Sequence, residues 1–150
     1  MVSSVSVTLS GFDEIQEGLR SFPARLGESA LRKAAVAGAR LIRDEAVLLA
    51  PEKKGILKRS IIVKHIDEAS DGANHQTYYV TIRQGIWFKD GKKVNSDDAY
   101  YWRFVEYGTA KSAAHPFMRP AFDGRIDAAF DAMRISLSDS VYQVFSDMHS

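Results

Sequence analysis

The sequence predicts an α+β fold in which a small antiparallel β-sheet packs against two long helices and carries a protruding β-hairpin. Three observations support this: a helical stripe of apolar residues in the N-terminal half, alternating segments in the middle, and a second helical stripe toward the C-terminus. The element order is one strand, two helices, three or four strands and a final helix, which is typical of the α+β class. At 150 residues the chain is most simply a single domain, residues 1–150.

The N-terminal half is expected to be mostly helical. Residues 5–9 alternate as a short strand, and residues 13–22 have the spacing of a short helix. Pro23 is well placed to begin a longer helix, which Pro51 ends. Gly38 lies beside the apolar stripe of this helix, and the many small residues there permit close approach of a neighbouring element. The expected stripe is Leu26, Ala30, Ala34, Ala37, Leu41 and Leu48.

The middle of the chain contains the expected strands. Pro51 and Gly55 form a turn, after which a strand of about ten residues is predicted, and residues 77–83 alternate as another strand. The Asp90-Gly91 pair favours a tight primed turn, so this segment should protrude as a lysine-rich hairpin. From residue 117 a final helix is expected, with this apolar stripe: Phe122, Ile126, Phe130, Met133, Leu137, Val141, Phe145 and Met148.

The composition excludes several classes of function. The formal net charge of +1 argues against a protein that binds by neutralising phosphates, because such proteins concentrate Lys and Arg without matching acids. The absence of cysteine excludes disulfide scaffolds, thiolate metal sites and a Cys nucleophile. The N-terminus has no basic segment followed by an apolar run, and no apolar stretch approaches the roughly 20 residues that span a bilayer. We therefore expect neither a signal peptide nor a membrane partner.

No catalytic, metal or cofactor motif is present, so neither an enzyme nor a bound cofactor is expected. The four histidines are scattered, and none has a second His or Cys at ligand spacing. Glu106, Ser112 and His115 match a catalytic triad in residue type, but nothing in the sequence indicates an ordered hydrogen-bond chain or an oxyanion site. The favoured interpretation is that Glu106 accepts backbone hydrogen bonds from the loop and that His115 packs before Pro116.

Residues 99–107 are expected to form a strand that is apolar on both faces. A strand in a small antiparallel sheet usually keeps one face in water, so either the protein's own helices or a neighbouring subunit should cover the second face. The alternation places Tyr100, Trp102 and Phe104 on one side, and Tyr101, Arg103 and Val105 on the other.

The segment that follows is tightly bounded. Gly108 can adopt a positive φ, and Thr109 can form a local hydrogen bond in the turn. Pro116 disfavours helix at the residue before it, and Pro120 suits the first turn of the last helix. The segment is therefore either a rigid corner between a strand and a helix or part of an interface, and these residues leave both open.

A small DNA-binding accessory protein is the alternative interpretation. Basic residues gather on the long helix and between Lys53 and Lys64. Acidic residues on the same helix offset them, and neither a recognition helix nor a stacking platform is evident. A solvated helix face explains these basic residues better.

Two stretches resemble a family of minor tail components of long-tailed, lambda-like bacteriophages, the neck or tail-completion proteins. Residues 104–121, FVEYGTAKSAAHPFMRPA, are similar to the family pattern v-E-[FY]-G-T-[SA]-k-x-x-a-x-P-F-[LM]-R-P-A. Residues 50–61, APEKKGILKRSI, resemble A-P-x-x-T-G-x-L-[KR]-x-S-I, with Lys54 in place of the usual Thr. The likeness spans most of the chain in order, and the hairpin around Asp90-Gly91 resembles an insertion.

This resemblance implies a structural virion protein rather than an enzyme. Members are similar to proteins that form rings, commonly of six copies, around the DNA channel where the tail tube meets the head connector. The implied partners are other copies of the chain, the tail tube protein and the connector or stopper ring, with DNA passing through without sequence-specific binding. The implied location is the neck or tail of a virion assembled in the bacterial cytoplasm. The residues expected to have interface or structural roles are Trp102, Phe104, Glu106, Tyr107, Gly108, Thr109, Pro116, Phe117, Arg119, Pro120, Pro51 and Gly55.

Overall fold

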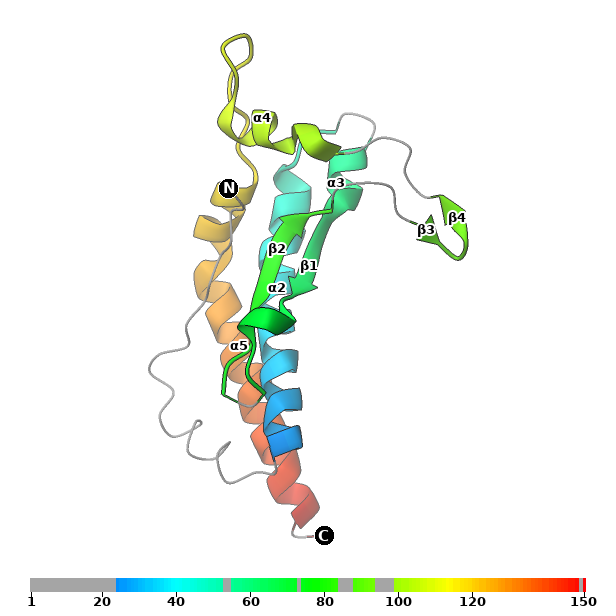
Figure 1. Ribbon diagram of the computed structural model, residues 1–150. Coiled ribbons are helices and arrows are strands. Elements are labelled where there is room, and N and C mark those ends of the chain that lie inside the picture. Colours follow the sequence, from blue (N-terminus) through cyan, green and yellow to red (C-terminus); the bar gives the residue numbers. More distant parts are fainter. Residues whose placement is uncertain (1–23, 53–54, 73, 84–87, 94–98, 149) are drawn as a thin grey trace.

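The computed structural model describes residues 24–52, 55–72, 74–83, 88–93, 99–148 and 150, with elements labelled as in Figure 1. The expected strand at residues 5–9 and the expected helix at residues 13–22 lie outside these residues. In chain order the elements are α2 (Ala24–Leu49), α3 (Ile56–Ser60), β1 (Ile61–His65), the 3-10 helix η1 (Asp67–Ala69), β2 (Tyr78–Ile82), β3 (Phe88–Lys89), β4 (Lys92–Lys93), the 3-10 helix η2 (Ala99–Tyr101), α4 (Trp102–Tyr107) and α5 (Met118–Met148).

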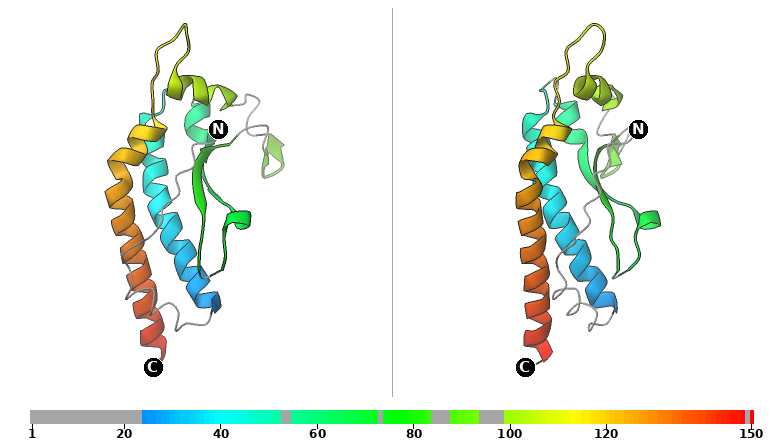
Figure 2. Two further views of the ribbon diagram at one scale, coloured as in Figure 1. Left: turned by 60° about the vertical axis from the view of Figure 1, so that its left-hand side comes forward. Right: turned by 90° about the vertical axis from the view of Figure 1, so that its left-hand side faces the viewer.

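Two long antiparallel helices form the axis of the molecule. α2 has 26 residues and α5 has 31, and they lie side by side in opposite directions, which makes the molecule elongated (Figures 1 and 2). Pro51 follows the end of α2, and Pro120 is in the first turn of α5, where a residue without an N–H is tolerated. Both long helices predicted from the sequence are confirmed.

The buried face of α2 is rich in alanine but differs in part from the predicted stripe. Ala30 and Ala34 are buried as expected, whereas Leu48 is 71% exposed. α2 lies between α5 and the β1–β2 sheet in both views of Figure 2, so it buries two adjoining faces rather than one stripe. The remaining buried alanine and isoleucine positions of α2 are Ala39, Ile42 and Ala46, with Ala50 directly after the helix.

The two helices approach each other closely at Gly38. A side chain at this position would collide with the side chain of Met133 and would lie 3.1 Å from the carbonyl oxygen of Ala129. Met133 is itself buried, at 5% exposure, and occupies the space that the glycine leaves. The close approach predicted from the small residues of α2 is confirmed here.

β1 and β2 form a two-stranded antiparallel sheet on the side of α2 that faces away from α5 (Figure 2). The register pairs Ile61 with Ile82 and Val63 with Val80. Ile61, Val80 and Ile82 are buried, so one face of the sheet packs on the core. The predicted strand at residues 77–83 is confirmed as β2.

β3 and β4 form a separate hairpin that stands away from the body of the molecule (Figure 1). Its turn has positive φ at both central residues, 52° at Asp90 and 74° at Gly91. This is the backbone geometry of the primed turn that an Asp-Gly pair favours. The protruding hairpin predicted from this pair is therefore confirmed.

The long strand expected directly after Gly55 is wrong in its first half, because Ile56–Ser60 form the helix α3 before β1 begins. Gly55 precedes α3 with φ of 65°, a conformation that glycine adopts without strain. Ile56, Leu57 and Ser60 are buried, and the Ser60 hydroxyl donates a hydrogen bond of 2.8 Å to the Ile56 carbonyl oxygen. Burial at positions one and four residues apart is the period of a helix.

The expected aromatic strand at residues 99–107 is also wrong, because this segment is helical in η2 and α4. Its buried residues are Ala99, Trp102 and Glu106, at the spacing of three and four that one helix face requires. Aromatic residues favour strands, but packing of this face on the core outweighs that preference.

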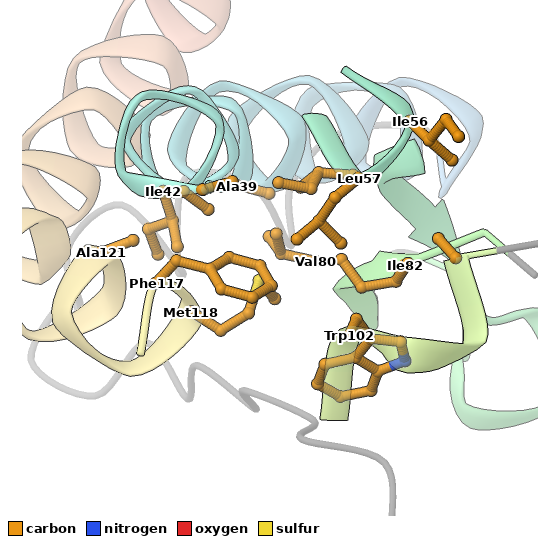
Figure 3. Packing of buried hydrophobic residues seen from close by; sticks show 14 of the residues in the cluster. Ala39, Ile42, Ile56, Leu57, Val80, Ile82, Trp102, Phe117, Met118 and Ala121 are labelled. Carbon is orange, nitrogen blue, oxygen red and sulfur yellow. The ribbon is translucent and has the colours of Figure 1, made fainter. Parts of the chain in front are cut away.

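The main hydrophobic core lies where α2, α3, the sheet, α4 and the start of α5 meet (Figure 3). Trp102 is 4% exposed and Phe117 is 0% exposed, and both pack in this cluster. The protein's own elements therefore cover the Trp102 ring, so the predicted second apolar sheet face does not exist. A smaller cluster holds the other end of the helical hairpin and consists of Ala30, Ala34, Met133 and Leu137.

We predict that Gly38→Ala lowers the free energy of unfolding by about 1–3 kcal/mol, because the new methyl group must displace Met133 and press on the α5 backbone. The matched control is Gly124→Ala, also inside a helix, where a side chain would meet nothing within 4 Å. That variant should gain about 0.5–1 kcal/mol from helix propensity. Urea denaturation followed by circular dichroism measures both changes. Equal stabilisation of the two variants would contradict the close approach.

Candidate functional site: the corner between α4 and α5

The corner between α4 and α5 is built around a buried carboxylate. Glu106 is 6% exposed, and its side chain reaches the first turn of α5. One carboxylate oxygen, Oε2, accepts hydrogen bonds from the backbone N–H groups of Phe117 at 2.8 Å and Met118 at 3.0 Å. The other oxygen, Oε1, accepts a bond of 3.1 Å from the N–H of Arg119. A single side chain thus binds three consecutive backbone amides.

These bonds satisfy the start of α5 almost completely. The first N–H groups of a helix have no partner within the helix, and the partial positive charge of the helix N-terminus favours an anion there. Glu106 binds the N–H groups up to Arg119, Pro120 has none, and the N–H of Ala121 donates to the Phe117 carbonyl oxygen at 3.2 Å. The prediction that Glu106 accepts backbone hydrogen bonds is confirmed, with donors from the first turn of the helix as well as the loop end.

α4 separates buried from exposed side chains according to its helical period. Trp102 and Glu106 face the core, whereas Phe104 is 55% exposed and Tyr107 is 64% exposed. The guanidinium of Arg103, an exposed residue, lies 5.6 Å from the centre of the Trp102 ring. The exposed face of this short helix therefore carries two aromatic rings and a cation.

A projecting loop connects α4 to α5 (Figure 1). Gly108 begins it with φ of 74°, and its N–H closes α4 by donating to the Phe104 carbonyl oxygen at 2.9 Å. At the tip the Thr109 N–H donates to the Ser112 carbonyl oxygen at 2.9 Å. The arm of the loop that leads to α5 is bound to α4 through the His115 N–H, which donates to the Val105 carbonyl oxygen at 2.8 Å. These backbone bonds connect the two arms of the loop and connect the loop to α4, while the side chains of residues 109–116 are exposed.

The other predicted site residues of the corner are either buried beneath it or exposed on its surface. Phe117 is fully buried beneath the corner, whereas Arg119 and Pro120 are exposed on the first turn of α5. Pro51 and Gly55 lie in the connection from α2 to α3. Their roles in an interface stay predictions.

The triad-like combination of Glu106, Ser112 and His115 does not assemble. Both carboxylate oxygens of Glu106 accept backbone N–H bonds in the core, whereas Ser112 and His115 are exposed on the loop. The carboxylate is therefore not available to orient the imidazole, which a Ser-His-Glu arrangement requires.

A second polar cluster closes the far end of the β1–β2 hairpin, and the sequence analysis did not identify it. His65 Nδ1 lies 2.8 Å from an Asp67 carboxylate oxygen, and its Nε2 lies 3.2 Å from the Ser70 hydroxyl oxygen. Nε2 is also 2.8 Å from Gln76 Oε1, whose own amide nitrogen donates to the Gly72 carbonyl oxygen. The Ser70 hydroxyl donates to the Ile66 carbonyl oxygen 2.7 Å away and accepts a hydrogen bond from the Thr77 N–H. The cluster orders the hairpin end and does not activate a nucleophile.

Comparison with known protein families shows to which family the chain belongs. The sequence profile of the family described as "Bacteriophage HK97-gp10, putative tail-component" matches residues 13–108, more than half of the chain. The chain belongs to the HK97-gp10-like family. Comparisons with curated proteins and with solved structures found no match.

Membership of the HK97-gp10-like family supports a structural bacteriophage tail protein and hence a location in the virion. The family recognised from its sequence motifs is confirmed. The matched residues include Glu106 and end at Gly108, so the projecting loop and α5 lie beyond them. None of the helices among the described residues is long and apolar enough to span a membrane.

We predict that Glu106→Gln destabilises the HK97-gp10-like chain by about 1–3 kcal/mol. The amide has one acceptor oxygen in place of two and lacks the charge that the α5 N-terminus favours, so a buried N–H loses its partner. Glu68→Gln, on the exposed η1 turn, should change stability by less than about 0.5 kcal/mol. Thermal unfolding of the two variants compares these values. An equal effect at both positions would contradict the capping role.

We also predict that Gly108→Val lowers stability by more than about 1 kcal/mol, because the residue has a positive φ. A side chain at this position would also lie 2.8 Å from the backbone nitrogen of Ala114 and 3.1 Å from the Ser112 carbonyl oxygen. Gly72→Val is the matched control: φ there is also positive, at 45°, but nothing lies within 4 Å of the added atom. A larger loss of melting temperature at Gly108 than at Gly72 isolates the steric contribution of the loop.

Proposed function

We propose that this tail component assembles as a homo-oligomeric ring, of six copies by the family resemblance, at the head–tail junction. In this role it joins the tail tube to the head connector around the channel through which DNA leaves the capsid. The chain contributes contact surfaces and no turnover.

The observation that carries this proposal is the exposed aromatic face of α4 in a protein that belongs to a tail-component family. Phe104 and Tyr107 together offer two rings that are more than half exposed on a helix, beside a loop with its own backbone hydrogen bonds. Aromatic side chains on a rigid support are typical of the energetically important centres of protein interfaces. We expect a surface of this kind in a protein that assembles with other proteins into a virion.

The charge distribution supports passage of DNA in preference to tight DNA binding. Several basic residues of α2 and α3 form ion pairs with acidic neighbours, as Arg32 with Glu28 at 2.8 Å and Lys58 with Glu52 at 3.1 Å. Paired cations of this kind release fewer counterions on meeting phosphates, which weakens the main contribution to nonspecific affinity. Salt-dependent retention of DNA by the purified chain would instead favour the DNA-binding accessory protein.

We predict that the double variant Phe104→Ser, Tyr107→Ser folds normally but produces separated heads and tails in electron micrographs of the phage. Both side chains are exposed, so their loss should leave the melting temperature nearly unchanged. The buried neighbours Trp102 and Phe117 are unsuitable for this experiment, because their truncation would cost about 3–5 kcal/mol of folding stability.

Glu68→Ser, on the exposed η1 turn, is the control surface change and should yield joined particles. Joined, infectious particles from the double variant would contradict the assignment of α4 as a contact surface. Absence of the chain from purified particles would contradict the ring itself.

A further inference from the structure

The β1–β2 sheet has two free edges among the described residues, because neither strand pairs with a third strand there. The Arg83 N–H donates to the Ser60 carbonyl oxygen at 2.7 Å, so these two residues form a hydrogen-bonded pair directly beyond the strands. Hydrogen-bonded and non-hydrogen-bonded pairs alternate along an antiparallel pair of strands. The residues of β2 whose backbone N–H and carbonyl groups point away from β1 are therefore Tyr78, Val80 and Ile82.

The free edge of β2 is the edge whose backbone groups need partners from the protein. Val80 is 4% exposed and Ile82 is 5% exposed, and backbone polar groups withheld from water require hydrogen-bond partners. On the free edge of β1, Val63 and His65 are partly exposed, and Ile61 is buried but is also the C-cap residue of α3. Among the described elements, β2 has extensive contacts only with β1 and α2, so no other element occupies its edge.

The two faces of this sheet differ in polarity. Val80 and Ile82 lie on the buried face, whereas Lys64 and Thr81 lie on the other face. A strand added at the edge of β2 must continue this pattern, because a shift of one residue would turn its apolar side chains outward. Residues 5–9, VSVTL, alternate apolar and polar side chains with the required period of two.

The length of chain before α2 is sufficient to bring residues 5–9 to this edge. α2 begins at Ala24, toward the end of the molecule where η1 lies and β2 begins (Figure 1). The connection, residues 10–23, spans about 21 Å at about 1.5 Å per residue even if it is wholly helical. A strand that leads toward the start of α2 runs antiparallel to β2, which runs away from that end.

We infer that residues 5–9 add to the free edge of β2 as a third, antiparallel strand, with Val7 opposite Val80. In this register all five residues pair with the five residues of β2. The apolar side chains join the buried face of the sheet, and Ser6 lies beside Thr81 on the other face. The inference does not depend on the proposed ring. An edge occupied in this way cannot pair with the same edge of another copy, so copies assemble through other surfaces.

Disulfide formation tests this pairing, because the natural chain contains no cysteine. In the inferred register Ser6 and Thr81 form a non-hydrogen-bonded pair with Cα atoms about 4.5 Å apart, a distance that a disulfide spans. Ser6→Cys combined with Thr81→Cys should therefore form a disulfide within one chain when the dilute protein is oxidised. Non-reducing gels and mass spectrometry of the linked peptides identify it.

The matched control is Ser6→Cys combined with Ile62→Cys. Ile62 lies opposite Thr81 on β1, one strand further from the inferred third strand. Two strand spacings of about 4.8 Å separate the two cysteines, which is more than a disulfide spans. This variant should remain reduced under the same conditions.

Amide hydrogen exchange of the full chain provides a second measurement that needs no cysteine. In the inferred strand the backbone of Val7 exchanges hydrogen bonds with Val80, whereas the Ser6 N–H points away from β2. Val7→Pro should speed exchange of the Val80 N–H at least about tenfold, because the pairing is lost. Ser6→Pro is the control and should change this rate less than about threefold, since proline is tolerated where the N–H faces solvent.

Each other outcome overturns the inference in a recognisable way. A disulfide between the cysteines at positions 6 and 62, and none between 6 and 81, would show that the segment pairs with β1. Disulfide-linked dimers of the first variant would show that the segment of another copy occupies the edge. No disulfide in either variant, together with equal exchange rates in the two proline variants, would show that the edge of β2 takes no strand from residues 5–9.

Discussion

The contact between the Glu106 carboxylate and the first turn of α5 is the constraint on which the corner depends. Three backbone N–H groups at the start of α5 need an acceptor, two of them buried, and an unpaired buried donor costs about 1–3 kcal/mol. Because Glu106 belongs to α4, meeting this requirement fixes α4 relative to α5. α5 in turn packs along α2, where Gly38 allows the close approach. The orientation of α4 on the whole helical hairpin follows from these two contacts.

The short helix α4 thereby contributes both to the core and to the exposed surface of the protein. Once Trp102 and Glu106 face inward, the helical period leaves Phe104 and Tyr107 facing outward. The stretch from Phe117 to Pro120 is explained in the same way. The Phe117 ring fills the core, and its N–H and those of the next two residues donate to Glu106. Pro120 has no N–H that would need an acceptor. The Glu and Pro positions of this motif have a physical reason that does not depend on what the surface contacts.

The long helices, the hairpin turn and β2 were predictable because each depends on local rules. The prolines, the Asp90-Gly91 pair and the alternation in residues 77–83 each determine the conformation of residues only a few positions away. The helical conformation of residues 99–107 was not predictable from alternation. Large residues occupy both faces of the expected strand, and the periods of a strand and of a helix each fit part of the segment. The informative signal was Glu106, four residues after Trp102, because a polar residue that shares a buried helix face with an aromatic one needs a partner from elsewhere. That partner, the α5 N-terminus, is 11 residues away and is visible only in three dimensions.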